Sequence, residues 1–160
     1  MRAFPTTPLL GALVFLFVGA LATPSDGSAQ DPADRFGVWR MQSDAPPPSS
    51  NIMTYEPYED DGMQITVAST NARGESNEWG YVTRFDGEFR EVSGQTGSDT
   101  SVEFVDEQTT RITNRRDGRV TQVIINTLSE DGNTIHNEYV RFDANGKITG
   151  VGHAVYERMR

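Results

Sequence analysis

Apolar and polar residues alternate along several runs of the chain that are rich in Val, Ile, Thr, Tyr and Phe. Examples of these runs are MQITVAST, WGYVTRF, VTQVIINTL, NTIHNEYVRF and KITGVGHAVYER. Such alternation is typical of β-strands, and no part of the chain beyond its N-terminal segment shows the apolar spacing of an amphipathic helix. The pattern therefore predicts an all-β protein with about eight to ten strands.

Pairs of Asp or Asn followed by Gly separate these runs and supply the positive φ angles of tight hairpin turns. The last three pairs are 14 residues apart, which fits an up-and-down meander of strands about ten residues long. Closing such a meander into a barrel removes its exposed edges, so we expect an antiparallel lipocalin-like β-barrel. A β-sandwich is the alternative. The five pairs are Asp61-Gly62, Asp86-Gly87, Asp117-Gly118, Asp131-Gly132 and Asn145-Gly146.

Several strands alternate incompletely, as a small barrel with a partly polar interior would. In WGYVTRF, the aromatic residues Trp79, Tyr81 and Phe85 share one face with Thr83. These three aromatic residues are expected to form the apolar wall of an interior, either as the lining of a ligand cavity or as plain core.

The N-terminal segment has the pattern of an export signal. The apolar run at 9–22 has the length of a signal-peptide core and is short for a membrane span, although an uncleaved anchor is the competing interpretation. We expect a signal peptide at 1–29, cleaved after Ala29 or alternatively after Ala22, followed by one barrel domain at 30–160. The chain has no cysteine, which suits an exported protein of the bacterial periplasm or the extracellular space.

The net charge of −9 argues against nucleic acid and acidic membranes as partners, because such a surface repels phosphate. No hydrolase motif and no phosphate-binding glycine loop is present. We expect no cofactor and no stable membrane insertion after signal cleavage.

The first and last strands carry a resemblance to a known group of barrels. FGVWRM at 36–41 places Gly37 two residues before Trp39, and VYERMR at 155–160 contains Arg158. This pairing resembles lipocalins and fatty-acid-binding proteins, in which an arginine of the final strand covers the first strand's indole and closes the base. The resemblance, over roughly 36–158, extends to small exported bacterial lipocalin-like proteins of unassigned function. Because the usual helix after the barrel is missing, it implies a shorter, helix-free barrel.

Both histidines lie on one predicted hairpin, where His136 and Glu138 share a face. A two-residue turn at Asn145-Gly146 would place His153 opposite Glu138. A three-residue turn beginning at Ala144 would place it opposite Asn137 instead, and the spacing of Asp and Gly favours this turn. A gathered cluster of the two histidines and Glu138 can bind a metal, and His153 alone can bind haem, but neither is the favoured interpretation.

The other face of the same strand holds Tyr139 and Arg141, which can bind a carboxylate through charge-assisted hydrogen bonds. The alternative is that Arg141 points outward and pairs with an acidic neighbour. We expect a protein that binds a small hydrophobic or amphipathic molecule in its interior. An enzyme is the less favoured class: a cofactor-free isomerase or cyclase would use His136 and Glu138 as its acid–base pair. A filled barrel with a structural or interaction role in the cell envelope is the third possibility.

Overall fold

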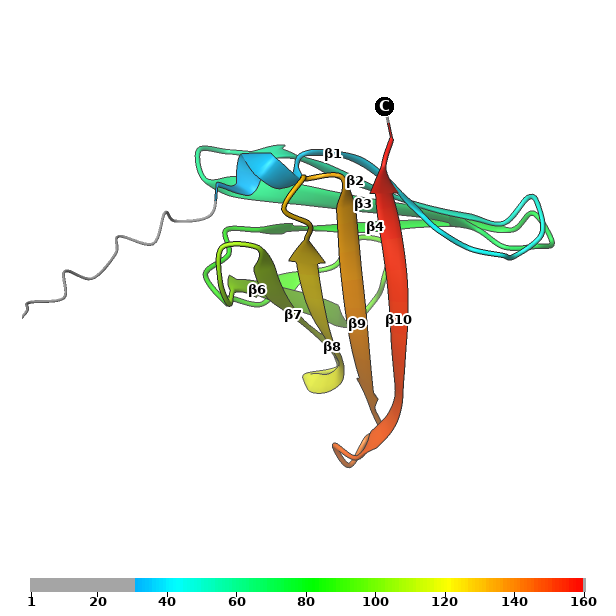
Figure 1. The fold of residues 1–160 in the computed structure, drawn as a ribbon. Helices are drawn as coiled ribbons and strands as arrows, with labels where there is room; N and C mark the ends of the chain where they lie inside the picture. Colours follow the sequence, from blue (N-terminus) through cyan, green and yellow to red (C-terminus); the bar gives the residue numbers. More distant parts are fainter. Residues whose placement is uncertain (1–30, 160) are drawn as a thin grey trace, which may run out of the picture.

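The computed structural model describes residues 31–159, and the predicted signal peptide lies outside this part of the chain. A short 3₁₀ helix, η1 (Pro32–Arg35), is followed by ten antiparallel strands (Figure 1). The prediction of an all-β fold is confirmed. The strands are β1 (Gly37–Met41), β2 (Ser50–Tyr58), β3 (Gly62–Thr70), β4 (Ser76–Thr83), β5 (Arg90–Glu91), β6 (Ser98–Phe104), β7 (Thr109–Arg116), β8 (Arg119–Leu128), β9 (Thr134–Phe142) and β10 (Ile148–Arg158).

The strands form one up-and-down sheet that curls into a nearly closed barrel. The order in the sheet is β4-β3-β2-β1-β10-β9-β8-β7-β6-β5, so the first strand pairs with the last in the middle of the sheet. The seam lies instead between β4 and β5, where an isolated bridge joins Gly80 to Ser93. Their backbones exchange two hydrogen bonds, of 3.2 Å and 2.8 Å, and these complete the wall.

Glycine is needed near this seam because the backbone there lies too close to a neighbouring strand for a side chain. A Cβ on Gly80 would lie 2.6 Å from the carbonyl oxygen of Ile65. A Cβ on Gly94 would lie 2.6 Å from the carbonyl oxygen of Glu78, and Gly94 also has a φ of +78°, which favours glycine. Gly94 therefore allows the close approach across the seam, whereas Gly80 allows the close packing of β4 on β3.

The base of the barrel is closed by η1 and by the ends of β1 and β10. Trp39 is fully buried, and its indole Nε1 donates a 3.0 Å hydrogen bond to the carbonyl of Arg35. The guanidinium carbon of Arg158 lies 4.1 Å from the centre of the Trp39 ring. This is the contact that the resemblance to lipocalins implies, and it is a favourable cation–π arrangement.

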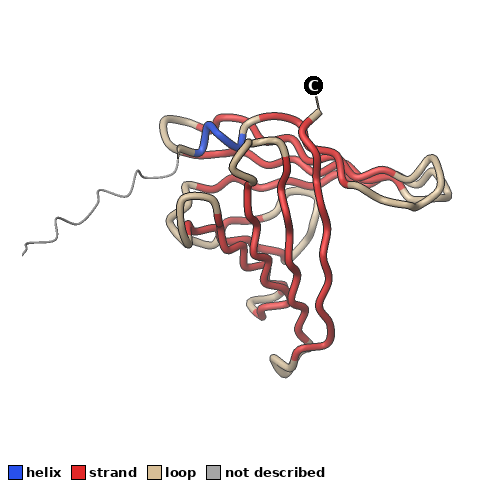
Figure 2. Tube along the Cα trace, in the orientation of Figure 1, coloured by secondary structure: helices blue, strands red, loops and turns tan. Residues whose placement is uncertain are grey.

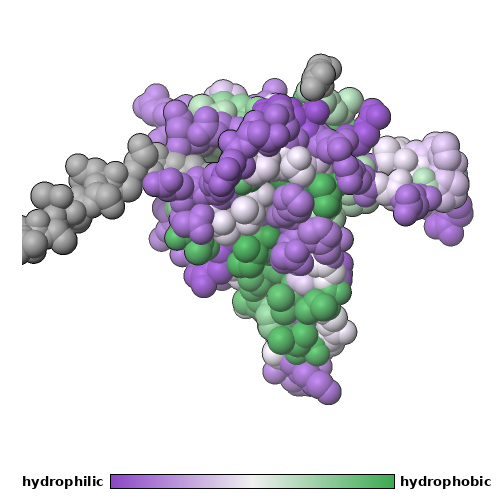
Figure 3. Space-filling view, viewed as in Figure 1, coloured by the Kyte–Doolittle hydropathy of each residue, from purple (hydrophilic) through white to green (hydrophobic). Residues whose placement is uncertain are grey.

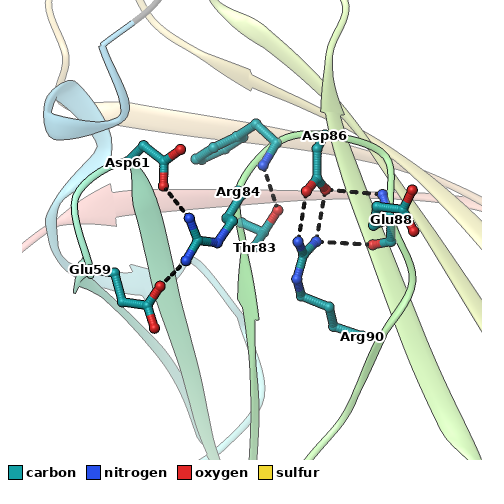
Figure 4. Close-up of polar contacts among 8 residues, drawn as sticks. Glu59, Asp61, Thr83, Arg84, Asp86, Glu88 and Arg90 are labelled. Atoms are coloured by element: carbon teal, nitrogen blue, oxygen red, sulfur yellow. Dashed lines mark hydrogen bonds and ion pairs between the residues drawn. The ribbon is translucent and has the colours of Figure 1, made fainter.

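At the base of the barrel, ion pairs join the β4–β5 connection to the β2–β3 turn and also form within the connection itself (Figure 4). Arg84 forms ion pairs with Glu59 and Asp61 on the β2–β3 turn, and its nitrogen lies 2.9 Å from Oδ1 of Asp61. Asp86 binds both terminal nitrogens of Arg90, at 2.7 Å and 2.6 Å, and this arginine holds the pKa of the Asp86 carboxyl well below its ordinary value. The connection is therefore a fixed loop.

The opposite end of the barrel is formed by long hairpins that diverge. Figures 1 and 2 show the β1–β2 and β3–β4 hairpins extending to one side, while the β9–β10 hairpin extends in another direction. The buried core fills the interior of the barrel, and many of its members come from alternate positions of the strands, such as Met63, Ile65 and Val67 on β3. Within residues 31–159, no helix is long and apolar enough to cross a bilayer.

Candidate functional site

A cavity of about 450 Å³ opens into the barrel between the two groups of hairpins. It is lined by residues from eight strands, β2 to β4 and β6 to β10, and from the β5–β6 connection. The lining residues are Asn51, Met53, Tyr55, Ile65, Val67, Trp79, Tyr81, Val92, Gln95, Ser98, Asp99, Thr100, Ile112, Asn114, Arg115, Arg116, Thr121, Gln122, Ile124, Asn137, Tyr139, Arg141 and Tyr156.

One wall of the cavity is apolar and comes from β2, β3 and β4. Met53, Ile65 and Val67 are buried there on the inward faces of β2 and β3. The rings of Trp79 and Tyr81 stack beside them, with centroids 6.2 Å apart and planes inclined by 13°. The result is a broad apolar surface with two aromatic rings on β4.

The facing wall is polar and comes mainly from β6, β7 and β8. The hydroxyl of Thr100 donates a 2.7 Å hydrogen bond to Oδ1 of Asn114, whose amide nitrogen donates to Oε1 of Gln122 at 3.0 Å. These three residues form a row across three neighbouring strands, which presents hydroxyl and amide groups to the interior. The cavity thus has two chemically different sides.

Four of the five tyrosines in the chain line this cavity. Burial raises the pKa of Tyr55 to about 12 and also raises the pKa values of Tyr81 and Tyr156 above the ordinary tyrosine value. These phenols therefore stay neutral at physiological pH and offer hydroxyl groups that can donate or accept. The fourth, Tyr139, accepts a 3.1 Å hydrogen bond from the amide of Asn137.

A buried arginine, Arg35, is connected by hydrogen bonds to the residues of the cavity lining. Arg35 is only 1% exposed, and its guanidinium donates to Oδ1 of Asn126 and, at 2.6 Å, to the carbonyl of Gln108. Asn126 in turn donates to Asn137 at 2.7 Å, so a chain of hydrogen bonds runs from the arginine to Tyr139. Burial lowers the pKa of Arg35, yet a guanidinium remains charged in proteins.

Two buried side-chain nitrogen or oxygen atoms have no hydrogen-bond partner in the described part of the chain. One is Nε of Arg35, and the other is Oδ1 of Asn51, which belongs to the cavity lining. Unpaired buried polar atoms are rare in native proteins, because each loses its bonds to water without replacement. The Asn51 oxygen is thus an acceptor available to a donor inside the cavity.

The mouth of the cavity is basic. Arg141 and Arg116 are exposed members of the lining at the end where the hairpins diverge. The guanidinium of Arg141 lies over the ring of Tyr139, with 5.6 Å between its carbon and the ring centroid. Arg115 pairs with Asp99 at 3.0 Å, whereas no ion pair joins Arg141 to any residue in 31–159.

The structure places four of the five residues predicted to bind a ligand in the cavity lining: Trp79, Tyr81, Tyr139 and Arg141. Phe85 does not line it, because β4 ends at Thr83 and Phe85 lies in the following connection with a φ of 56°. Its ring stacks instead on Phe104, with centroids 4.4 Å apart. The alternation of WGYVTRF was extended too far, since the turn at Asp86-Gly87 already bends the chain at Phe85.

His136, Glu138 and His153 lie together on the outer face of the barrel and are exposed. Nδ1 of His153 is 2.6 Å from Oε1 of Glu138, and the two imidazole rings are 5.8 Å apart. This cluster does not reach the cavity, so it supplies no acid–base pair to an interior reaction. Within residues 31–159, no three His, Cys, Asp or Glu side chains are arranged to hold a metal ion.

The register of the β9–β10 hairpin explains why these residues meet. The three-residue turn is confirmed: Gly146 donates to the carbonyl of Asp143 at 3.0 Å, and Asp143 donates to the carbonyl of Lys147 at 2.9 Å. A bulge between Ile148 and Gly150 then shifts the register by one residue. His153 therefore pairs with Glu138, and the expectation that this turn would place it opposite Asn137 is wrong.

Sequence reasoning missed several members of the site. Met53, Ile65 and Val67 belong to alternating runs, so their strands were expected, but nothing in one sequence shows which strands border an open interior. Asn114 and Gln122 read as ordinary polar strand residues. Arg35 precedes the first strand, where a charged residue is usually solvated.

Comparison with solved structures identifies the architecture. The wild-type fluorescent protein UnaG superposes with a TM-score of 0.54 at 12% identity, covering 78% of this chain and 96% of UnaG. A UnaG variant with one asparagine replaced by alanine gives a TM-score of 0.56, also at 12% identity, covering 80% of this chain and 98% of the variant. The chain is an antiparallel up-and-down barrel that resembles the lipocalin and fatty-acid-binding-protein fold. At this identity the likeness shows the fold alone.

No protein-family model matches the chain, and no curated protein matches its sequence. The chemistry of the site must therefore be argued from the cavity itself.

Proposed function

We propose that this barrel binds a small amphipathic molecule in its interior, with an apolar body and an anionic or strongly polar end. The observation that carries the proposal is the cavity of about 450 Å³ with one apolar and one polar wall. Binding pockets for small molecules typically have volumes of about 300–1,000 Å³ and combine apolar lining with a few placed polar groups. A filled barrel with a purely structural role would have no such space.

The apolar body of the ligand would lie against the wall made by Met53, Val67 and Trp79. Removing apolar surface from water contributes about 25 cal/mol per Å², so contact with this wall supplies the main driving force for binding. The stacked rings of Trp79 and Tyr81 suit a flat or elongated apolar group.

The anionic end of the ligand would lie at the mouth, beside Arg141. This arginine has no ion-pair partner in residues 31–159 and lines the cavity next to Tyr139. A ligand carboxylate there would accept charge-assisted hydrogen bonds from the guanidinium. The unpaired oxygen of Asn51 accepts hydrogen bonds, so a ligand that also carries a hydroxyl or amide donor would be favoured.

A thermal-shift panel tests this proposal. The panel compares fatty acids and other amphipathic carboxylates with their alcohols and methyl esters. A ligand present at about 100 times its Kd stabilises the folded state by about 2.7 kcal/mol, a rise in Tm on the order of 10 °C. We expect carboxylates to give larger shifts than the uncharged analogues. A panel in which no member raises the Tm would contradict the proposal.

A pair of variants locates the anionic end. Arg141→Gln is expected to weaken carboxylate binding by about tenfold or more, while affinity for the matching alcohol stays nearly unchanged. Arg111→Gln is the control, because Arg111 is an exposed residue of β7 that pairs with Glu103 and does not line the cavity. Equal losses for both variants would place the anionic group elsewhere.

We further propose that the barrel works outside the cytoplasm, in a bacterial periplasm or the extracellular space. The support is the apolar run at 9–22, followed by small residues, and the lack of cysteine in the whole chain. Cell fractionation together with N-terminal sequencing tests this. Export predicts a mature N-terminus after Ala29 or Ala22, whereas an intact N-terminus in the cytoplasmic fraction would contradict it.

A further inference from the structure

An apolar patch covers the outer face of β8, β9 and β10 near their hairpin tips. Val123, Val140 and Val151 pair in register across the three strands, so their side chains form one row. Val151 is 76% exposed, and Ile148, at the start of β10, is 57% exposed. Figure 3 shows this region as a continuous hydrophobic area in the lower part of the molecule.

Basic residues border this apolar patch. The β7–β8 hairpin carries Arg119 beside the exposed Val120, and the β9–β10 hairpin carries Lys147 beside Ile148. Neither Arg119 nor Lys147 forms an ion pair with any other residue in 31–159. Asp117 and Asp143 also lie on these two turns, but segments 115–121 and 141–148 together contain five basic and two acidic side chains. The net charge of −9 belongs to the chain as a whole, so its argument against acidic membranes does not extend to this end.

We propose that these two hairpins, with Arg119, Val120, Lys147, Ile148 and Val151 as their contact residues, dock reversibly on an anionic lipid bilayer. We call this set the docking end. Lysine and arginine next to a membrane are attracted by acidic headgroups, and exposed aliphatic side chains enter the boundary between headgroups and acyl chains. The docking end offers both kinds of residue on adjacent turns.

The arrangement of charge favours a lipid surface over a second copy of the chain. A symmetric dimer places the same patch of each subunit against itself, so the excess of basic side chains on one subunit would face the same excess on the other. Such like-charge contacts oppose association. A bilayer with acidic headgroups instead satisfies the basic and the aliphatic residues at the same time.

The docking end also lies beside the mouth of the cavity. Arg116 and Thr121, which line the cavity, flank the β7–β8 turn that carries Arg119. Arg141, also in the lining, lies on β9, which leads into the other hairpin. A bilayer bound there would face the opening. The inference about docking does not depend on whether the cavity binds a ligand.

Vesicle co-sedimentation tests the inference, and it uses the protein purified from its own host with its natural N-terminus. The vesicles contain either phosphatidylcholine alone or phosphatidylcholine with phosphatidylglycerol. We expect binding to the anionic vesicles that falls steeply as salt is raised, because exposed charges are screened. Arg119→Gln and Lys147→Gln are each expected to lower the partition coefficient about fivefold. Val151→Ser is expected to lower it about threefold or more.

Matched variants at the other end of the barrel serve as controls. Val105 is 59% exposed on the β6–β7 connection, and Arg40 is exposed on β1 near the base. Val105→Ser and Arg40→Gln should leave vesicle binding unchanged. Because all variants have the same N-terminus, any contribution of that segment to vesicle binding is the same in each and does not affect the comparison. Equal effects at both ends, or no binding to anionic vesicles, would overturn the proposal.

Sedimentation equilibrium without lipid distinguishes docking on a membrane from a dimer formed through the same patch. A dimer that Val151→Ser dissociates, in a protein that does not bind anionic vesicles, would show that the patch pairs with a second copy. A monomer that binds vesicles supports the proposal. Failure of ligand binding in the thermal-shift panel would not alter either result, so the two proposals can fail separately.

Discussion

The guanidinium of Arg158 lies over the indole of Trp39, with 4.1 Å between the guanidinium carbon and the ring centroid. The two residues are directly paired between β1 and β10. The same guanidinium donates hydrogen bonds to the carbonyls of Gly132, at 2.8 Å, of Asp34, at 2.8 Å, and of Phe36. One side chain therefore joins η1, the first strand, the last strand and the β8–β9 turn. This junction closes the base of the barrel, at the end opposite the hairpins that carry Arg116 and Arg141 of the cavity lining.

Replacing this arginine should weaken the whole barrel. Arg158→Met is expected to lower the free energy of unfolding by about 2–4 kcal/mol, since it removes a cation–π contact and hydrogen bonds from a charged donor. Urea denaturation measures this loss. Arg40→Met, on the exposed side of β1, should change stability by about 0.5 kcal/mol or less. Equal stability of the two variants would contradict the proposed role of Arg158.

The buried pair of Arg35 and Asn126 should behave as a unit. Arg35→Met is expected to cost about 2–4 kcal/mol, because it leaves Asn126 and the Gln108 carbonyl without their donor. Replacing Asn126 by leucine alone should cost a similar amount, because the arginine charge then loses its partner. The double variant should cost clearly less than the sum of the two. Additive losses in the same denaturation assay would show that the two side chains act separately.

The seam between β4 and β5 depends on Gly94. Gly94→Ala is expected to destabilise the barrel by about 2–4 kcal/mol, because the added Cβ meets the carbonyl of Glu78 in a backbone conformation already unfavourable for alanine. Gly118→Ala is the matched control: its φ is +76°, but a Cβ there meets nothing within 4 Å. It should cost only about 1 kcal/mol. Similar losses at both positions would show that the seam is not tightly closed.

Much of the architecture could be predicted from local pattern. The Asx-Gly turns and the alternation between them give the meander, whereas the closure of the base by Trp39 and Arg158 was implied by the resemblance to lipocalins. The position of the seam could not be predicted, because it depends on the approach of Gly80 to Ser93, which are on separate segments. Local pattern contains no information about such contacts.

The candidate site was predicted only in part, for related reasons. Tyr139 and Arg141 could be found because residues two apart on a strand share a face. His153 could not be placed, because the bulge after Ile148 changes the register without an unambiguous sequence signal. Phe85 was misplaced because a backbone bend outweighed the alternation of its strand.

The ion pair of Asp86 with Arg90 predicts a specific pH dependence. Because the pKa of the Asp86 carboxyl is depressed in the folded state, its contribution is fully present above its unfolded pKa of about 3.9 and is lost as pH falls below that value. Arg90→Gln should therefore lower stability by about 1 kcal/mol or less at pH 6, since the pair is partly exposed. The difference from wild type should shrink below about pH 4. A difference that is constant from pH 6 to pH 2.5 in thermal melts would contradict this.

A cavity-filling variant tests whether the interior is the binding site. Val67→Phe enlarges a residue of the apolar wall and should reduce ligand affinity by about tenfold or more, because the added ring occupies ligand space. Thr66→Phe, at the next residue of β3, points to the opposite face and should leave affinity unchanged. Titration of both variants with a carboxylate from the panel provides the comparison.

Native mass spectrometry of the protein purified from its own host tests the central claim most directly. The account predicts that wild type carries a non-covalent small-molecule mass, and that Val67→Phe, purified in the same way, carries much less of it. A wild-type barrel with no adduct, or an adduct retained equally by Val67→Phe, would contradict the claim that the interior holds the ligand.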